Sequence, residues 1–256
     1  MADRALVQLT IAGEVATVVL DAPASRNALS QAVLAALQAQ LDAAVAHPGL
    51  RVVVLGHTGP AFCAGADLVE QRRTGGLGVA GLVPVLRTIW EAPVPVVARI
   101  GGAVRGGGMG LVAACDLAVA ADTASFGFSE VRLGVAPAVV SVICRHKLGV
   151  AALAEAFLTG RPLDAARARA IGLIHRTVPG SELDREVAEL VADLRRGGPG
   201  ALAATKRILN HQPDRALETA LDRMGDRSVE LFRSPEAQEG MAAFMQRRPP
   251  SWVHEP

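Results

Sequence analysis

Apolar and polar positions alternate through the first twenty residues in the pattern of two short strands. The segments ALVQLTI (5–11) and EVATVVLD (14–21) flank the turn at 12–13, which predicts an antiparallel hairpin. In SQAVLAALQAQLDAAVAH (30–47), apolar side chains recur every three or four residues, as they do in an amphipathic helix. The run RVVVLGH (51–57) is continuously apolar and β-branched, which is typical of a strand covered on both faces.

Predicted helices and strands continue to alternate through the middle of the chain. The glycine-rich segment GGLGVAG (75–81) predicts a mobile loop near a site entrance, and GLVPVLRTIWEA (81–92) predicts a helix. The apolar run VPVVARI (94–100) predicts a strand, and a glycine-rich stretch then opens a short helix. A strand at DLAVA (116–120) and a helix over about 138–148 follow. This order favours an α/β fold.

Beyond about residue 180 the strand pattern stops and only helical segments follow. They cover 181–196, 199–210, 214–224 and 234–246. Ser234 and Pro235 are suited to start the last of them. Apolar residues of this tail would form one face that packs on the core or on a neighbouring subunit: Leu221, Met224, Phe232, Met241, Phe244 and Met245. We therefore expect a core over 1–196 and a helical region over 197–256.

Composition and charge narrow the functional classes. Half of the 256 residues are hydrophobic and 20% are charged, which is ordinary for a globular protein. A net charge of +1 provides no long-range attraction to nucleic acid or to an anionic membrane. Aromatic residues amount to 3% and include no tyrosine, so base-stacking surfaces are not expected. We expect neither a nucleic acid nor a membrane among the partners.

Cysteine usage and the start of the chain indicate the compartment. Cys63, Cys115 and Cys144 are far apart and form no CxxC pair, so we expect them to be small core residues. The start MADRALVQLT is charged and lacks the apolar segment of a secretory signal. No apolar run approaches the roughly 18 residues that a membrane span requires. These features favour a protein of the reducing cytoplasm.

The first candidate for chemistry is HTGPAFCAGADL (57–68), a loop that follows a buried strand. The small residues Ala64, Gly65 and Ala66 leave backbone N–H groups uncovered, so a ligand oxygen could approach them. Asp67 then precedes a helical segment. A plain connection between a strand and a helix would use the same residue types.

The second candidate is IGGAVRGGGMGLVAACD (100–116), which places Gly106, Gly107 and Gly108 at the start of a short helix. It fits the dinucleotide pattern GxGxxG only in a shifted register and lacks an acidic residue at the end of the next strand, which disfavours a Rossmann site. Bare N–H groups at a helix N-terminus attract negative charge. Together with the loop at 64–66, they would present two donors to one developing oxyanion.

The third candidate is FGFSEVRLGVAP (126–137), where Glu130 follows Ser129 among apolar neighbours. Desolvation there would raise the pKa of the carboxyl group and suit it to proton transfer, although a capping or solvated glutamate also fits this segment. The sequence contains no HExxH, GxSxG or Walker A motif, and its six histidines show no metal-ligand spacing. We therefore expect neither a metal nor a bound cofactor.

Taken together, these stretches resemble the crotonase superfamily, the enoyl-CoA hydratase/isomerase fold. The matching pieces are RNALS (26–30), AFCAGADL (61–68), GGAVRGGGMGLVAACD (101–116), FGFSEVRLGVAP (126–137) and the helical tail. The resemblance implies a spiral of β-β-α turns whose C-terminal helices assemble homotrimers, often paired as hexamers. It also implies an acyl-CoA thioester as the substrate, with coenzyme A entering as part of that substrate.

The resemblance also implies roles for individual residues. The backbone N–H groups of Ala66 and Gly107 match the family's oxyanion hole, and Glu130 matches one of two catalytic glutamates. Positions that line the CoA moiety correspond to Arg26, Ala28, Ala64, Asp67 and Leu68, and Lys206 is a candidate contact for its phosphates. We expect Gly106 and Gly108 to border the substrate as well.

The other glutamate of the well-studied hydratases falls on Gly110. A glycine there would free space over the thioester but supplies no proton acceptor. Adding water to a 2-enoyl thioester then requires Glu130 to act in a relay, whereas moving a double bond from position 3 to position 2 needs only one base. Two segments nevertheless resemble bacterial hydratases of the methylglutaconyl- and short-chain enoyl-CoA type. They are SEVRLGVAPAVVS and GMGLVAACD.

We therefore expect an enoyl-CoA hydratase acting on a short or branched 2-enoyl-CoA. One alternative is a Δ3,Δ2-enoyl-CoA isomerase with Glu130 as the sole base. The other is a member that binds acyl-CoA without catalysis, which the missing glutamate makes conceivable.

Overall fold

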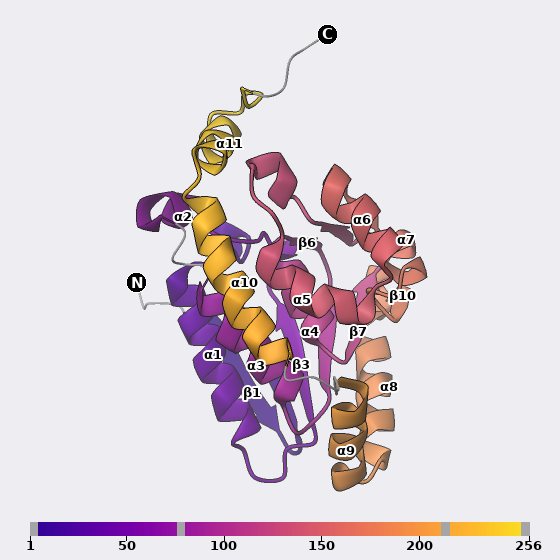
Figure 1. The fold of residues 1–256 in the computed structure, drawn as a ribbon. Coiled ribbons are helices and arrows are strands. Elements are labelled where there is room, and N and C mark those ends of the chain that lie inside the picture. The colour runs from indigo at the N-terminus through magenta and orange to yellow at the C-terminus, as the bar shows by residue number, and fades with distance from the viewer. Residues whose placement is uncertain (1–4, 76–79, 211–215, 252–256) are drawn as a thin grey trace.

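A parallel-rich sheet organises the chain, whose computed structural model describes residues 5–75, 80–210 and 216–251 (Figure 1). Within these residues the main sheet has six strands in the order β1-β2-β3-β5-β7-β10. They are β1 (Val7–Ala12), β2 (Val15–Leu20), β3 (Val52–His57), β5 (Val96–Ile100), β7 (Leu117–Ala121) and β10 (Arg176–Val178). Strands β1 and β2 pair antiparallel, which confirms the predicted hairpin, and the later neighbours pair parallel.

A smaller sheet, with four strands in the described part of the chain, has the order β4-β6-β8-β9. Its strands are β4 (Ala61–Cys63), β6 (Ala103–Arg105), β8 (Ser125–Gly127) and β9 (Leu163–Asp164). Strands β4, β6 and β8 follow β3, β5 and β7 respectively, so each turn adds one strand to each sheet before it enters a helical segment. This order confirms the expected α/β spiral of β-β-α turns.

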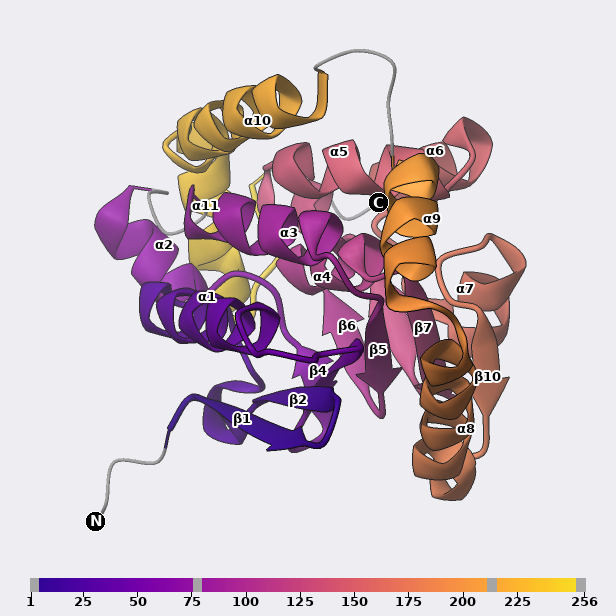
Figure 2. The same cartoon turned by 90° about the horizontal axis from the view of Figure 1, so that it is seen from below.

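Strand β3 explains why the run at 51–57 is continuously apolar. Its Val53 and Leu55 belong to the main core, whereas Val52 and Val54 pack with α8 (Leu183–Arg196) on the opposite face. Figure 2 shows α8 along one side of the sheet and the other core helices across from it. Both faces of the strand are therefore buried, as the pattern predicts.

Four helices lie on the other side of the main sheet and contribute many of the core residues (Figure 2). They are α1 (Gln31–Val45), α3 (Leu82–Glu91), α4 (Gly107–Ala114) and α5 (Ala138–Lys147). Helix α1 begins at Ser30, whose Oγ accepts a hydrogen bond from the N–H of Val33 at 3.2 Å. Helix α4 is buried from Gly108 to its end, so the glycine-rich segment enters the centre of the molecule.

The remaining helices surround this core. They are α2 (Leu68–Thr74), α6 (Val150–Thr159), α7 (Ala165–Ala170), α9 (Pro199–Asn210), α10 (Ala216–Phe232) and α11 (Pro235–Met245), with short 3₁₀ turns η1 (Pro23–Ser25), η3 (Glu130–Leu133) and η4 (Gly180–Glu182). Helix α10 crosses α5 and α3, and α11 reaches η3 and α2 (Figures 1 and 2). The loop predicted at 75–81 falls mainly on residues 76–79, which lie outside the described residues.

The apolar face expected along the tail is divided in the structure. Leu221, Phe232 and Met241 are buried in the core and Met224 is half-buried, whereas Phe244 and Met245 are 65% and 38% exposed. The reason is that α11 turns one side toward η3 and leaves another side outside. The expected boundary between 1–196 and 197–256 stays a prediction.

Close backbone contact joins α11 to η3. A Cβ on Gly240 would lie 2.4 Å from the carbonyl oxygen of Leu133, and a Cβ on Gly134 would lie 2.7 Å from the carbonyl oxygen of Glu236. Gly134 also has a φ of +72°, which L side chains rarely adopt. Glycine at both positions therefore lets the last helix hold η3, which begins at Glu130.

We expect Gly240→Ala to destabilise the fold. The added methyl group would meet a backbone oxygen that no rotamer change can move, at an overpacking cost of about 1–3 kcal/mol. Alanine gains at most about 1 kcal/mol in helix propensity, so the clash should dominate. Chemical denaturation measures the change. Gly200→Ala in α9 is the matched control, because a Cβ there meets nothing within 4 Å and should be neutral or stabilising. Equal stability of Gly240→Ala and wild type would contradict this packing.

Candidate active site

A cavity of about 690 Å³ gathers most of the residues that the sequence singled out. Its walls come from the loops around 24–29 and 64–71, the start of α4, the η3 region and the last two helices. The predicted site residues that line it are Arg26, Ala28, Ala64, Ala66, Asp67, Leu68, Gly106, Gly107 and Glu130. Segments far apart in sequence therefore meet at one site.

Two loops touch backbone to backbone beside Ala66 and Gly107. A Cβ on Gly65 would lie 3.2 Å from the carbonyl oxygen of Arg105, and a Cβ on Gly106 would lie 3.5 Å from Cα of Gly65. Both glycines have positive φ, +91° and +50°, which side chains disfavour. This contact brings the peptide groups of the two loops side by side.

The N–H groups of Ala66 and Gly107 are open to a ligand. Within the described residues neither donates to a protein acceptor. The other end of the Gly65–Ala66 peptide group is engaged, because the carbonyl of Gly65 accepts from the N–H of Leu29 at 2.7 Å. Gly107 is also the first residue of α4, whose N-terminus favours negative charge. Two donors of this kind can hold an oxygen on which negative charge develops.

Asn27, which the sequence analysis did not select, anchors the loop opposite these amides. Its side chain is fully buried and donates to the carbonyls of Ala61 at 2.8 Å and Thr58 at 3.0 Å, while its Oδ1 accepts from the N–H of Ala22. Its φ is +55°, a region that asparagine tolerates better than most residues. The asparagine in RNALS was the available signal, but its partners are distant in sequence.

Glu130, at the start of η3, approaches the same loops from another side of the cavity. Its Oε1 lies 3.7 Å from the position that a Cβ on Gly106 would take. Its Oε2 is buried and has no hydrogen-bond partner in the described part of the protein. Burial raises the pKa of Glu130 to about 7, because little else stabilises the charged form. A carboxyl group with this pKa exchanges protons readily near neutral pH.

Gly108 and Gly110, two of the predicted substrate contacts, are not among the described residues that line the cavity. A Cβ on Gly110 would lie 2.8 Å from Cγ1 of Val140, and it is Val140 that lines the cavity. A Cβ on Gly108 would lie 2.7 Å from Cβ of Cys63. Both glycines let α4 pack closely against its neighbours and do not border the substrate space. A glutamate at position 110 would have to displace Val140 to reach the cavity.

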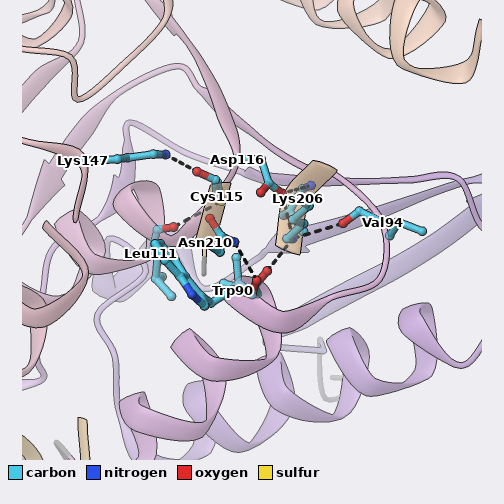
Figure 3. Close-up of polar contacts among 10 residues, drawn as sticks. Trp90, Val94, Leu111, Cys115, Asp116, Lys147, Lys206 and Asn210 are labelled. Atoms are coloured by element: carbon cyan, nitrogen blue, oxygen red, sulfur yellow. Dashed lines mark hydrogen bonds and ion pairs between the residues drawn. The ribbon is translucent and has the colours of Figure 1, made fainter. Parts of the chain in front are cut away.

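Lys206, the predicted phosphate contact, does not line the cavity either. Figure 3 shows its ammonium group directed at Asp116 and at two backbone carbonyls. Its Nζ lies 2.8 Å from Oδ2 of Asp116, donates to the carbonyls of Ile89 at 2.9 Å and Val94 at 3.1 Å, and the side chain is only 5% exposed. The lysine therefore ties α9 to the edge of the core and is not available for phosphates.

Few charged side chains line the cavity. Asp67 caps α2, because its Oδ1 accepts from the N–H of Glu70 at 3.0 Å. Arg26 and Arg132 line the cavity and are exposed, so they bring positive charge to its outer part. Negative groups of a ligand would be attracted there.

Among the described residues, no group of three or more His, Cys, Asp or Glu side chains could hold a metal ion. No helix in this part of the chain combines the length and the apolar character needed to cross a bilayer.

Comparison with known proteins gives the same family over nearly the whole chain. The sequence model of the enoyl-CoA hydratase/isomerase family matches residues 10–255. The enoyl-CoA isomerase/hydratase fer4 of Mycosarcoma maydis is 34% identical over 246 residues, which cover 91% of this chain and 90% of that protein.

Solved structures similar to this chain include members of the same family. The crystal structure of an enoyl-CoA hydratase from Mycobacterium avium is 41% identical, covers 98% of this chain and 100% of its own, and superposes with a TM-score of 0.87. A methylmalonyl-CoA decarboxylase bound to 2-nitronate-propionyl-CoA is 26% identical, covers 97% of this chain and 98% of its own, and gives a TM-score of 0.83. The fold therefore accommodates more than one reaction of CoA thioesters.

We expect Lys206→Met to reduce stability without weakening CoA-thioester binding. Removing the ammonium group takes the ion-pair partner from Asp116, which is 17% exposed and keeps the hydrogen bond from the N–H of Val96, so we expect a cost of about 1.5–3 kcal/mol. Denaturation curves measure the stability, and calorimetric titration with a saturated acyl-CoA measures binding. Arg207→Met, on the exposed side of the same helix, is the control. Unchanged stability together with weaker binding would instead support Lys206 as a contact of the CoA phosphates.

We expect Glu130 to make stability fall as pH rises. The folded protein holds its proton more tightly than the unfolded chain does, so this contribution is complete below about pH 4.5 and is lost as pH rises to about 7. The free energy of unfolding of wild type minus that of Glu130→Gln should therefore fall by roughly 3 kcal/mol across this range. Urea titrations of both proteins at several pH values test this. A difference independent of pH would mean that the carboxyl group is not desolvated.

Proposed function

Because the chain belongs to the enoyl-CoA hydratase/isomerase family, we propose that it adds water across the double bond of a 2-enoyl-CoA thioester, short or branched as in methylglutaconyl-CoA. The family acts on acyl-CoA thioesters, so a CoA ester is the starting point for the mechanism. The observation that carries the proposal is the pair of unengaged N–H groups, on Ala66 and Gly107, in the cavity that also holds Glu130.

The two amides would bind the thioester carbonyl oxygen. When water adds to C3, electrons move through the double bond onto that oxygen and an enolate forms. Fixed N–H donors in a cavity stabilise this charge without having to reorganise, and the N-terminus of α4 adds to the effect. A Cβ on Gly107 would lie 2.8 Å from Cδ1 of Leu29 and 3.2 Å from Cδ2 of Leu82, so glycine there lets the start of α4 pack against two side chains that also line the cavity.

Glu130 would carry the proton. In its ionised form it takes a proton from the attacking water as the C3–O bond forms, and it then returns a proton to C2 as the enolate collapses. The net change is the addition of one water, and the carboxylate is regenerated. A pKa of about 7 suits both steps, because the acid and the base are then of similar strength at neutral pH.

A second candidate is the shift of a double bond from position 3 to position 2. Among the described residues that line the cavity, the carboxylates are Asp67 and Glu130, and Asp67 is engaged as the cap of α2. One base is sufficient for an isomerase, which removes a proton from C2 and returns it at C4. The position matching the other glutamate is Gly110, with Val140 packed over it.

We further propose that the protein assembles as a homotrimer or as a hexamer, as the resemblance implies. The exposed Phe244 and Met245 on α11 would be covered by a neighbouring subunit. We also propose that it acts in the cytoplasm and that coenzyme A enters only as part of the substrate.

The hydration of crotonyl-CoA tests the proposal. We expect wild type to abolish the absorbance of the conjugated thioester and to yield a product heavier by one water, as measured by mass spectrometry. Glu130→Gln keeps the shape of the side chain but cannot accept the proton, so we expect kcat to fall about 100-fold or more. Binding of saturated butyryl-CoA should be retained, since it needs no proton transfer.

The other functions give different results in the same assay. An isomerase would convert 3-enoyl-CoA esters to their 2-enoyl isomers without a change in mass. A protein that only binds acyl-CoA would leave both substrates unchanged while still binding butyryl-CoA. Either outcome, across a panel of chain lengths, would rule out the hydratase.

A further inference from the structure

Gln71 is a buried polar residue that none of the steps above uses. It lies on α2, lines the cavity and has an exposed fraction of 0%. Neither its Nε2 nor its Oε1 has a hydrogen-bond partner within the described residues. Because folded proteins pair nearly all of their buried polar atoms, a side-chain amide with two unpaired atoms indicates a group that a ligand would satisfy.

The position of Gln71 relates it to the acyl chain of the substrate. Helix α2 begins directly after Ala66 and Asp67, so Gln71 lies about one helical turn, or roughly 6–8 Å, beyond the amide of Ala66. Leu68 precedes it by three residues and therefore shares its face of the helix. A thioester held at Ala66 and Gly107 would place Gln71 beyond the reacting carbons.

Most of the residues that line the cavity together with Gln71 are apolar. The end of α2 is joined to the end of α10, because Nε of Arg233 donates to the carbonyl of Gly75 at 2.8 Å, and Figure 1 shows the two helix ends adjacent. Phe232, at this end of α10, is buried and lines the cavity together with the buried Ser228. An alkyl chain would fit this wall but would leave the amide of Gln71 unpaired.

The chemistry of the amide selects the ligand group. Its Nε2 donates and its Oε1 accepts, so a hydroxyl group can satisfy both, donating to Oε1 and accepting from Nε2. A carboxylate can only accept, and it would set a negative charge against Oε1. We propose that Gln71 determines specificity and that the preferred substrate carries a hydroxyl group on its acyl chain beyond C3. This inference rests on the proposed function for the identity of the ligand as an acyl-CoA.

Binding of unreactive saturated thioesters tests the inference without relying on catalysis. Each hydroxylated ester is paired with the ester that has a methyl group in place of the hydroxyl: 4-hydroxybutanoyl- with pentanoyl-CoA, 5-hydroxypentanoyl- with hexanoyl-CoA, and 6-hydroxyhexanoyl- with heptanoyl-CoA. We expect wild type to bind the hydroxylated member of at least one pair about tenfold more tightly or better, as a site built for a hydroxyl does. Gln71→Leu and the more isosteric Gln71→Met should remove or reverse that preference.

Gln38→Leu is the matched control. Gln38 lies on α1 outside the cavity, and its Nε2 donates to Asp42 and to Thr88, each at 2.8 Å. This variant should keep the wild-type preference. Thermal melts show whether the Gln71 variants fold, and Gln71→Met provides a second result if Gln71→Leu does not.

The outcomes separate the inference from the proposed function. Equal binding within every pair by wild type, or an unchanged preference in both Gln71 variants, would overturn the role of Gln71. Unchanged binding with slower turnover of every 2-enoyl ester would also overturn it, since Gln71 would then orient water. A hydroxyl preference that depends on Gln71 in a protein that hydrates no enoyl-CoA would support the inference and reject the hydratase.

Discussion

Direct contact between two backbones, at Gly65 and Gly106, is the constraint on which the site depends. A side chain on Gly65 would crowd the carbonyl of Arg105, and both glycines adopt a positive φ that L side chains disfavour. Ala66 and Gly107, which follow these two glycines, line the same cavity, and in the proposed function their N–H groups bind one thioester oxygen. The spiral of two sheets supplies the rest, since β4 and β6 are neighbours and each leads into one of these loops.

The cavity collects polar groups that the fold leaves unpaired. The two amides, the Oε2 of Glu130 and the side-chain amide of Gln71 each lack a protein partner within the described residues. In a packed interior such groups lower stability, so their presence in one place marks where the fold gives up stability for binding. The raised pKa of Glu130 has the same origin, because desolvation favours its neutral form.

Several polar groups elsewhere in the core bond within the protein, although the Oε1 of Gln38 and the hydroxyl of Thr177 are also buried without a partner among the described residues. Asn27 uses both ends of its amide on three backbone groups. Lys206 and Asp116 form a buried pair that also engages the carbonyls of Ile89 and Val94 and the N–H of Val96. These residues maintain the scaffold, and their charges and hydrogen bonds have no capacity left for a ligand.

Local sequence determined the helices, the strands and the two loops rich in small residues, at 64–66 and 106–108. The spacing of apolar residues and the glycine content are properties of short segments, so they can be read without knowing the tertiary structure. The hairpin, the run at 51–57, the helix capped by Ser30 and the glycines before α4 were all evident in this way. Tertiary structure alone decided which side chains reach the cavity. Lys206 pairs with Asp116, Gly110 is covered by Val140, and Gln71 is left without a partner. Each depends on contacts between segments distant in sequence, which no local pattern encodes.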